Sequence, residues 1–165
     1  MGGIVVSDTG PLISLETIPD GFAFLRKMAD RVLIPRAVLL EVDAKRTAPA
    51  SFLRLHHLTD LVEVISGIDA SRLTIMPGAR PLHQGELEAL ALAMDRKLPI
   101  LLEDADARRF AKSVGLTFVG IGGLILAAAQ KSIIDRPEAL RMLDALMVAN
   151  RLPRRLRDTL AQELP

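Results

Sequence analysis

The chain has 165 residues, a formal net charge of +1, 50% hydrophobic and 25% charged residues, and no cysteine. This composition is typical of a globular protein, and we expect a single domain over residues 1–165. The lack of cysteine excludes disulfides and thiolate metal sites, so a bound metal would have oxygen or histidine ligands. The sequence opens without a signal-peptide pattern, and no apolar run reaches the ~20 residues of a membrane span. We therefore expect a soluble, cytoplasmic protein.

Short apolar runs alternate with helical patterns along the first half of the chain. The elements expected there are, in order, a strand over residues 4–6, a helix beginning near Leu12 with Pro11 in its first turn, a strand over residues 32–34, a helix over residues 37–42, a helix over residues 52–58 and an edge strand over residues 61–65.

The second half continues the alternation after an irregular stretch. The elements expected there are a loop over residues 67–82, a helix over residues 86–96 opened by Gly85, a strand over residues 99–102, a helix over residues 105–114, a strand over residues 117–121, an Ala-rich helix up to Lys131, and two helices over residues 137–148 and 153–163. Strands separated by helices predict an α/β fold whose parallel sheet is covered on both faces. We expect residues 132–165 to form a C-terminal helical extension of this domain.

Four acidic residues stand out because such a fold would bring them together. Asp8 and Asp104 each follow a predicted strand, and open α/β sheets bind ligands beyond the carboxyl ends of their strands. Glu41 and Glu86 lie in helical stretches. Two carboxylates ~4 Å apart repel by roughly 4 kcal/mol at an effective dielectric of 20, and a hard divalent cation would offset that repulsion. The pattern therefore indicates a metal site.

Each of these residues also has a purely structural interpretation, and the sequence leaves both open. Asp8 could bond backbone amides in a turn, and Asp104 could cap the helix that follows it. Glu41 could face solvent, and Glu86 could gain ~0.3–1 kcal/mol from the dipole of its helix. Thr9 could either cap a helix or add its hydroxyl to the water shell of a metal. Only the joint placement of the acids favours the metal site.

The Asp-Thr-Gly at residues 8–10 and the glycine-rich residues 119–123 are similar to aspartic-protease motifs. The fold of those proteases is all-β and pairs two such aspartates, whereas this chain has one Asp-Thr-Gly and mostly helical patterns.

Basic residues gather in three places and could follow a phosphate backbone or simply form solvated helix faces. These residues are Arg26, Lys27, Arg31 and Arg36, then Arg108, Arg109 and Lys112, and finally Arg151, Arg154, Arg155 and Arg157. With no Tyr or Trp, the chain lacks an aromatic platform for stacking bases.

Four motifs in sequence order resemble those of the PIN-domain nucleases. They are Asp-Thr-Gly-Pro-Leu-Ile after the first strand, Ile-Pro-Arg-Ala-Val-Leu-Leu-Glu-Val, Gly-Glu-Leu-Glu-Ala-Leu-Ala-Leu-Ala, and Leu-Leu-Glu-Asp-Ala-Asp-Ala-Arg-Arg. The resemblance runs from about Ile4 to Leu126. It is strongest to small prokaryotic PIN-like proteins related to the ribonucleases of toxin–antitoxin modules.

The resemblance implies a Rossmann-like three-layer α/β/α sandwich and hydrolysis of RNA phosphodiester bonds that depends on Mg²⁺ or Mn²⁺. Its catalytic and metal-binding residues correspond to Asp8, Glu41, Glu86 and Asp104. Relatives often have two aspartates where this chain has Glu103 followed by Asp104, which leaves the role of Glu103 open.

Further residues and partners complete the hypothesis. Thr9 and Asp106 are candidates for an outer shell around the metal, and Arg108 and Arg109 are candidates for holding the flanking RNA backbone. The resemblance also implies an antitoxin protein as a candidate partner and, with the C-terminal helices, a homodimer. The alternative function is a catalytically silent PIN-like module that binds RNA or a partner protein.

Overall fold

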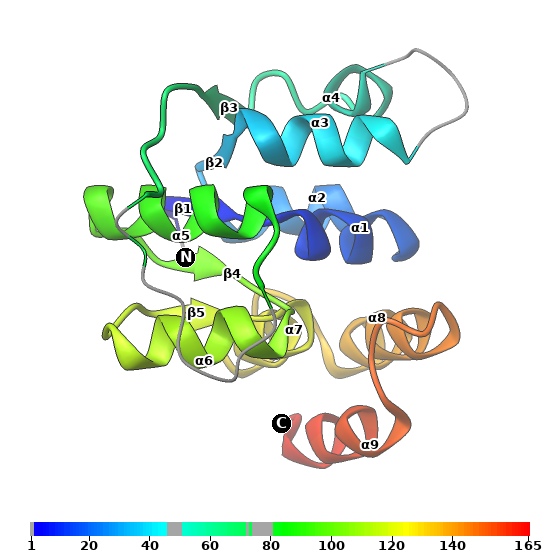
Figure 1. Ribbon diagram of the computed structural model, residues 1–165. Helices are drawn as coiled ribbons and strands as arrows, with labels where there is room; N and C mark the ends of the chain where they lie inside the picture. The colour runs from blue at the N-terminus through cyan, green and yellow to red at the C-terminus, as the bar shows by residue number, and fades with distance from the viewer. Residues whose placement is uncertain (1, 46–50, 72, 74–80) are drawn as a thin grey trace.

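Five parallel strands form one sheet at the centre of the protein (Figure 1). The structure, a computed structural model, describes residues 2–45, 51–71, 73 and 81–165. The strands are β1 (Ile4–Ser7), β2 (Arg31–Pro35), β3 (Val62–Ile65), β4 (Ile100–Leu101) and β5 (Phe118–Val119). They lie in the order β3-β2-β1-β4-β5, and every neighbouring pair is parallel. The predicted parallel α/β sheet is confirmed, and β3 lies at an edge as expected.

Helices connect the strands and continue after the last one. They are α1 (Thr9–Thr17), α2 (Gly21–Met28), α3 (Arg36–Ala44), α4 (Phe52–Leu55), α5 (Gln84–Arg96), α6 (Ala105–Ser113), α7 (Ile121–Gln130), α8 (Arg136–Val148) and α9 (Arg154–Glu163). None of the helices in the described part of the chain is long and apolar enough to cross a membrane.

Apolar side chains form two cores, one on each face of the sheet. Alternate residues of a strand point to opposite faces, so Ile34 belongs to one core and Leu33 to the other. The smaller core holds apolar residues of α5 and α6, among them Leu90 and Phe110. The larger core collects side chains from α1, α2, α3, α7, α8 and α9. This arrangement is the three-layer α/β/α sandwich that the sequence predicts.

The C-terminal helices α8 and α9 contribute to the larger core. Leu143 and Leu160 are buried there with residues of α1 and α7. A Cβ at Gly122 in α7 would lie only 2.9 Å from Leu160 Cδ1, so the small residue lets α9 approach closely. Figure 1 shows the two helices side by side at one end of the fold.

The structure corrects the expected elements in three places. Residues 21–28 form α2, a helix that was not predicted. α4 ends at Leu55 rather than continuing to residue 58, because His57 adopts a left-handed backbone conformation with φ of 53°. The last strand stops at Val119, and Gly120 instead caps α7. Part of the loop expected over residues 67–82, namely residues 72 and 74–80, lies outside the described residues.

The strand order changes direction beside the central strand. The chain moves outward from β1 to β2 and β3, then crosses back to β4 on the other side of β1. Loops that leave β1 and β4 therefore diverge toward opposite faces and open a crevice, which is where open α/β sheets bind their ligands.

Candidate functional site

The carboxyl end of the sheet carries a cleft of about 350 Å³. Its walls come from the segments after β1 and β4, from α3, from the start of α5 and from the turn between α8 and α9. The lining residues are Asp8, Thr9, Gly10, Glu41, Lys45, His83, Glu86, Glu103, Asp104, Asn150 and Arg151. All four acidic residues that the sequence indicates lie in this one cleft, with Glu103 as a fifth carboxylate.

Asp8 is the most deeply buried carboxylate of the cleft. It follows β1 directly and retains only 3% of its accessible surface. Its Oδ1 atom has no hydrogen-bond partner among the described residues, and its side chain makes no capping hydrogen bond to α1. Buried polar groups are normally hydrogen-bonded because an unmade bond costs about 1–3 kcal/mol. The geometry therefore does not support the interpretation of Asp8 as a simple capping residue.

The surroundings of Asp8 disfavour its charged form. Burial, and then the negative charges of Glu86 and Glu41, raise the pKa of Asp8 well above its ordinary value, to about 6. The backbone amides of Thr9 and Gly10 act in the opposite direction but do not offset these effects. A nearby cation would reverse this balance, since it favours the carboxylate over the neutral acid.

Glu41 is held in place from two sides. Thr9 Oγ1 donates a hydrogen bond of 2.5 Å to Glu41 Oε2, and the Gly85 amide donates one of 3.0 Å to Oε1. A Cβ at position 85 would lie 2.6 Å from Oε1, so only glycine leaves room for the carboxylate. The Gly-Glu motif thus has a physical basis: Gly85 admits Glu41, while the next residue, Glu86, supplies another carboxylate.

Glu86 and Asp104 both bond to the starts of helices. The His83 amide donates a hydrogen bond of 2.8 Å to Glu86 Oε2. Asp104 caps α6, because its Oδ1 accepts hydrogen bonds of 2.9 Å from the amides of Asp106 and Ala107. The capping interpretation therefore describes real contacts of these two residues. The Asp8 side chain makes no capping hydrogen bond of comparable geometry, although the amides of Thr9 and Gly10 lie close enough to lower its pKa.

Glu103 has a partner that the sequence did not predict. Arg151, in the turn after α8, donates from Nη2 to Glu103 Oε2 at 2.7 Å, and Ser14 Oγ donates to the same oxygen at 2.7 Å. Arg151 also donates from Nε to Ser14 Oγ at 2.8 Å and from Nη2 to the Gly10 carbonyl at 3.0 Å. No local pattern signals these contacts, because Arg151 lies 48 residues from Glu103 and 137 from Ser14.

The remaining predicted residues lie outside the cleft lining. Asp106 forms an ion pair with Arg109 in the first turn of α6, and the Arg109 side chain is 67% exposed. Arg108 donates from Nε to the Leu102 carbonyl at 2.9 Å, and its guanidinium fills the space where a Cβ at Gly120 would lie. A role for Asp106 around a metal, and for the two arginines in binding substrate, stays a prediction.

The carboxylates line one cleft but are not arranged as a complete metal-binding site. Within the described ranges, no three acidic or histidine side chains are arranged as a ready metal-binding group. Glu41, Glu86 and Asp104 instead accept hydrogen bonds from Thr9 and nearby backbone amides. The donor set nevertheless fits a hard divalent cation, because all the acids supply oxygen and Asp8 Oδ1 is buried without a partner.

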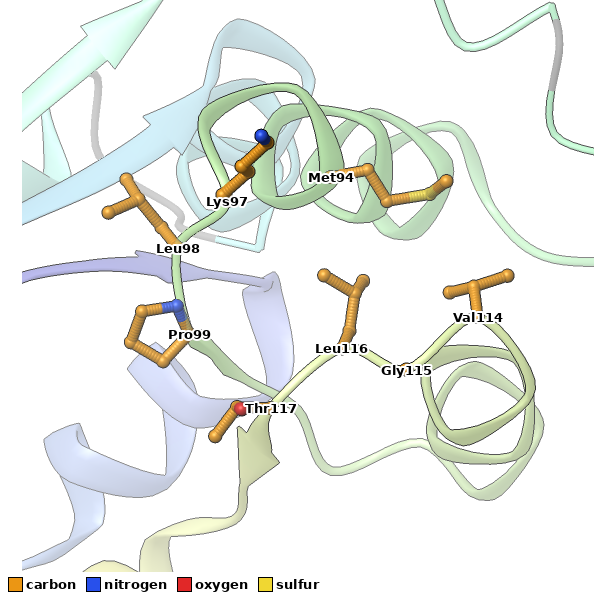
Figure 2. Close-up of a pocket in the computed structure, with 8 residues that line it drawn as sticks. All are labelled: Met94, Lys97, Leu98, Pro99, Val114, Gly115, Leu116 and Thr117. Atoms are coloured by element: carbon orange, nitrogen blue, oxygen red, sulfur yellow. The ribbon is translucent and has the colours of Figure 1, made fainter.

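A second, larger hollow lies at the opposite end of the sheet. It measures about 470 Å³ and is lined by the ends of α5 and α6 and by the residues that precede β4 and β5. Figure 2 shows Val114 and Leu116 pointing toward the helix that carries Met94. Among the described residues of this lining, Lys97 is the only charged one and none carries a carboxylate. The described lining thus differs from that of the acidic cleft.

A comparison with protein families identifies the fold. The sequence matches the model of the DUF3368 family, described as a PIN domain, over residues 4–164. The chain belongs to the PIN-domain family. PIN domains have a nuclease-type fold, generally act on nucleic acid and generally use divalent metal ions. The match covers α8 and α9 as well, beyond the region over which motifs were recognised in the sequence. No curated protein matches the chain.

Proposed function

We propose that this PIN domain is a metal-dependent endoribonuclease whose active site is the acidic cleft. The observation that carries the proposal is the Asp8 carboxylate, which is buried, has an unpartnered Oδ1 and lines a cleft with four further carboxylates. Burial and the neighbouring carboxylates disfavour the charged form of Asp8, and a cation in the cleft would stabilise it. In a nuclease-type fold, a divalent metal ion at this position would be that cation.

Each carboxylate has a role in this proposal. Asp8 and Asp104 would hold Mg²⁺ or Mn²⁺, and Glu41 and Glu86 would bind it directly or through water. When bound, the cation would lower the pKa of a water molecule and offset the charge of the scissile phosphate. Glu41 or Asp104 would orient the attacking water and accept its proton. Thr9 and Gly85 keep Glu41 in the orientation that this step needs.

We extend the proposal to a toxin–antitoxin role, on the resemblance to PIN-like toxins. An antitoxin would insert an arginine into the cleft, because a guanidinium pairs with a carboxylate through two hydrogen bonds. A homodimer is also proposed, and Val148 and Leu156 are exposed apolar residues of the C-terminal segments that could contribute to it. The cytoplasmic location stays a prediction.

One observation favours the alternative of a silent PIN-like module that binds RNA or a partner without cleavage. Glu41, Glu86 and Asp104 accept hydrogen bonds from the protein itself, and no three acidic or histidine side chains of the described residues are arranged as a metal-binding group. Metal affinity and cleavage together distinguish the two functions. A silent module binds RNA with no dependence on Mn²⁺ and shows no cleavage.

The decisive experiment compares the parent protein with Asp8→Asn and Asp104→Asn. Asparagine retains the capping ability of position 104 while removing the charge, so both variants should fold. We expect calorimetry to show Mn²⁺ binding to the parent and at least tenfold weaker binding to both variants, with loss of Mn²⁺-dependent RNA cleavage. Asp95→Asn, at an exposed position near the other end of α5, is the matched control. Undiminished RNA cleavage by Asp8→Asn would contradict the proposed role of Asp8 as a metal ligand.

A further inference from the structure

Arg151 is held at the edge of the acidic cleft by contacts on one side of its guanidinium group. It lies in the turn between α8 and α9, and its side chain is 30% exposed. Nε bonds to Ser14, and Nη2 bonds to the Gly10 carbonyl and to Glu103. These three bonds fix both the position and the plane of the group.

The bonding of Arg151 leaves one nitrogen available. A guanidinium has five N–H donors, of which three are used by Ser14, Gly10 and Glu103. The two donors on Nη1 have no acceptor in the described part of the chain. Nη1 is also absent from the buried atoms that lack a partner, a set that contains only Asp8 Oδ1. Nη1 is therefore reached by solvent, on a residue that lines the cleft.

The same contacts define the role of Glu103. Its Oε2 accepts from both Arg151 and Ser14, and the Glu103 side chain is only 17% exposed. This oxygen accepts hydrogen bonds from both side chains. Glu103 thus acts as the counter-charge that positions Arg151.

Among the described residues that line this cleft, a nucleic-acid backbone meets five carboxylates and two basic side chains, those of Lys45 and Arg151. Arginine suits phosphate because its planar fork presents N–H groups in a fixed geometry and is more weakly hydrated than an ammonium group. Arg151 is already fixed, so little side-chain entropy would be lost on binding.

We propose that Arg151 is a substrate-binding residue that donates from Nη1 to a backbone phosphate next to the scissile bond, and that Ser14 and Glu103 position it. The inference rests on the proposed nuclease function for the identity of the substrate. It assigns the turn after α8 to the binding surface, so the C-terminal helices form part of the site as well as of the core.

The test is binding of a labelled single-stranded RNA oligonucleotide by anisotropy in EDTA, at salt concentrations from 50 to 200 mM. Arg151→Met should bind at least about tenfold more weakly, as expected for loss of a charge-assisted hydrogen bond. The plot of log K against log salt should also become shallower by about 0.7, the value for one phosphate contact on a single strand. Arg96→Met is the control, because Arg96 is an exposed arginine at the far end of α5, and it should bind like the parent.

A second variant separates the contact from net charge and from folding. Arg151→Met combined with Glu103→Gln removes the ion pair as a unit, which leaves net charge unchanged and no buried charge unpaired. This double variant should still bind several-fold more weakly than the parent. The inference is overturned if the double variant binds RNA as tightly as the parent, or if Arg151→Met weakens RNA binding no more than Arg96→Met does.

Kinetics distinguish binding from a merely structural role. In the presence of Mn²⁺, Arg151→Met should raise KM for RNA more than it lowers kcat; a fall in kcat with unchanged affinity overturns the inference. If the parent cleaves RNA but RNA binding does not depend on Arg151, only the inference about Arg151 is refuted. If RNA binding depends on Arg151 but the parent does not cleave RNA, only the proposed nuclease function is refuted.

Discussion

The acidic cleft lies beyond the carboxyl end of β4, whereas the apolar hollow lies before the amino end of the same strand. The helices α5 and α6 reach both regions. They begin at the cleft, near Glu86 and Asp104, and end at the hollow, near Lys97 and Val114. The two regions are thus built from the opposite ends of the same elements.

The direction of these helices explains the difference in chemistry. A helix carries about half a positive charge at its N-terminus and half a negative charge at its C-terminus. The starts of α5 and α6 donate backbone amides to Glu86 and Asp104, so anionic groups are tolerated at the cleft. The hollow at the other end is larger, at about 470 Å³ against 350 Å³, yet none of its described lining residues carries a carboxylate. Acidic groups therefore gather where helices begin, not where the larger hollow lies.

The largest effect on the cleft is expected from Gly85→Ala. The new Cβ would lie 2.6 Å from Glu41 Oε1, so this carboxylate must move although no charge is removed. A displacement of about 1 Å at a reacting group can reduce activity 100-fold, and we expect a loss of that order in RNA cleavage. Gln84→Ala, one residue earlier and exposed, should cleave like the parent. Equal activity of both variants would mean that the position of Glu41 is unimportant.

The second-largest effect is expected on the free energy of unfolding, which should depend on pH through Asp8 by a few kcal/mol. The pKa of Asp8 is raised to about 6 when folded, against ~3.9 when unfolded. The folded state therefore binds the extra proton between these values, and the free energy of unfolding falls as pH rises from about 4 to 6. The contribution of Asp8 is on the order of 3 kcal/mol. In EDTA, Asp8→Asn should be at least as stable as the parent at pH 7 and should lack this pH dependence.

Bound metal should reverse the order of stability of the parent protein and Asp8→Asn. Saturating Mn²⁺ should stabilise the parent by ~2.7 kcal/mol at a hundredfold excess over the dissociation constant, and the Asn variant should lose most of that gain. Urea unfolding of both proteins at pH 5 and 7, with EDTA or Mn²⁺, measures each difference. A destabilised Asp8→Asn and a parent insensitive to metal would identify Asp8 as a structural residue.

The smallest effect is expected at the hollow. Val114 is 41% exposed and ends α6, so Val114→Ser should change the free energy of unfolding by less than about 0.5 kcal/mol. RNA cleavage and oligonucleotide affinity should match those of the parent. A fall in either quantity, with stability preserved, would show that the apolar hollow takes part in substrate binding.

The sequence predicted those parts of the fold and site that depend on local patterns. Apolar runs followed by acids placed Asp8 and Asp104 after β1 and β4, and parallel connections bring such positions to one edge. The contact between Arg151 and Glu103 could not be predicted, because it depends on how α8 packs against α1 and α7. The tight fit between Gly85 and Glu41 is likewise a tertiary contact, although the Gly-Glu motif is visible in the sequence.

Two errors in the predicted elements have local causes. α2 was not predicted although Phe24, Leu25 and Met28 are buried at helical spacing, because a helix of eight residues shows little more than two turns of the pattern. The strand expected up to residue 121 was too long because Val119 and Ile121 look alike in sequence. In the structure Gly120 lies between β5 and α7, and Arg108 occupies the space beside it.

The contact between Ser14 and Arg151 joins residues that are 137 positions apart. At ribosomal rates of ~5–20 residues per second, roughly 7–27 s separate the synthesis of these two residues. Asp8, Glu41, Glu86 and Asp104 all precede Arg151 in the chain and are therefore synthesised first. On the proposed role of Arg151, a nascent chain carries its acidic residues before it carries the arginine that binds a phosphate backbone.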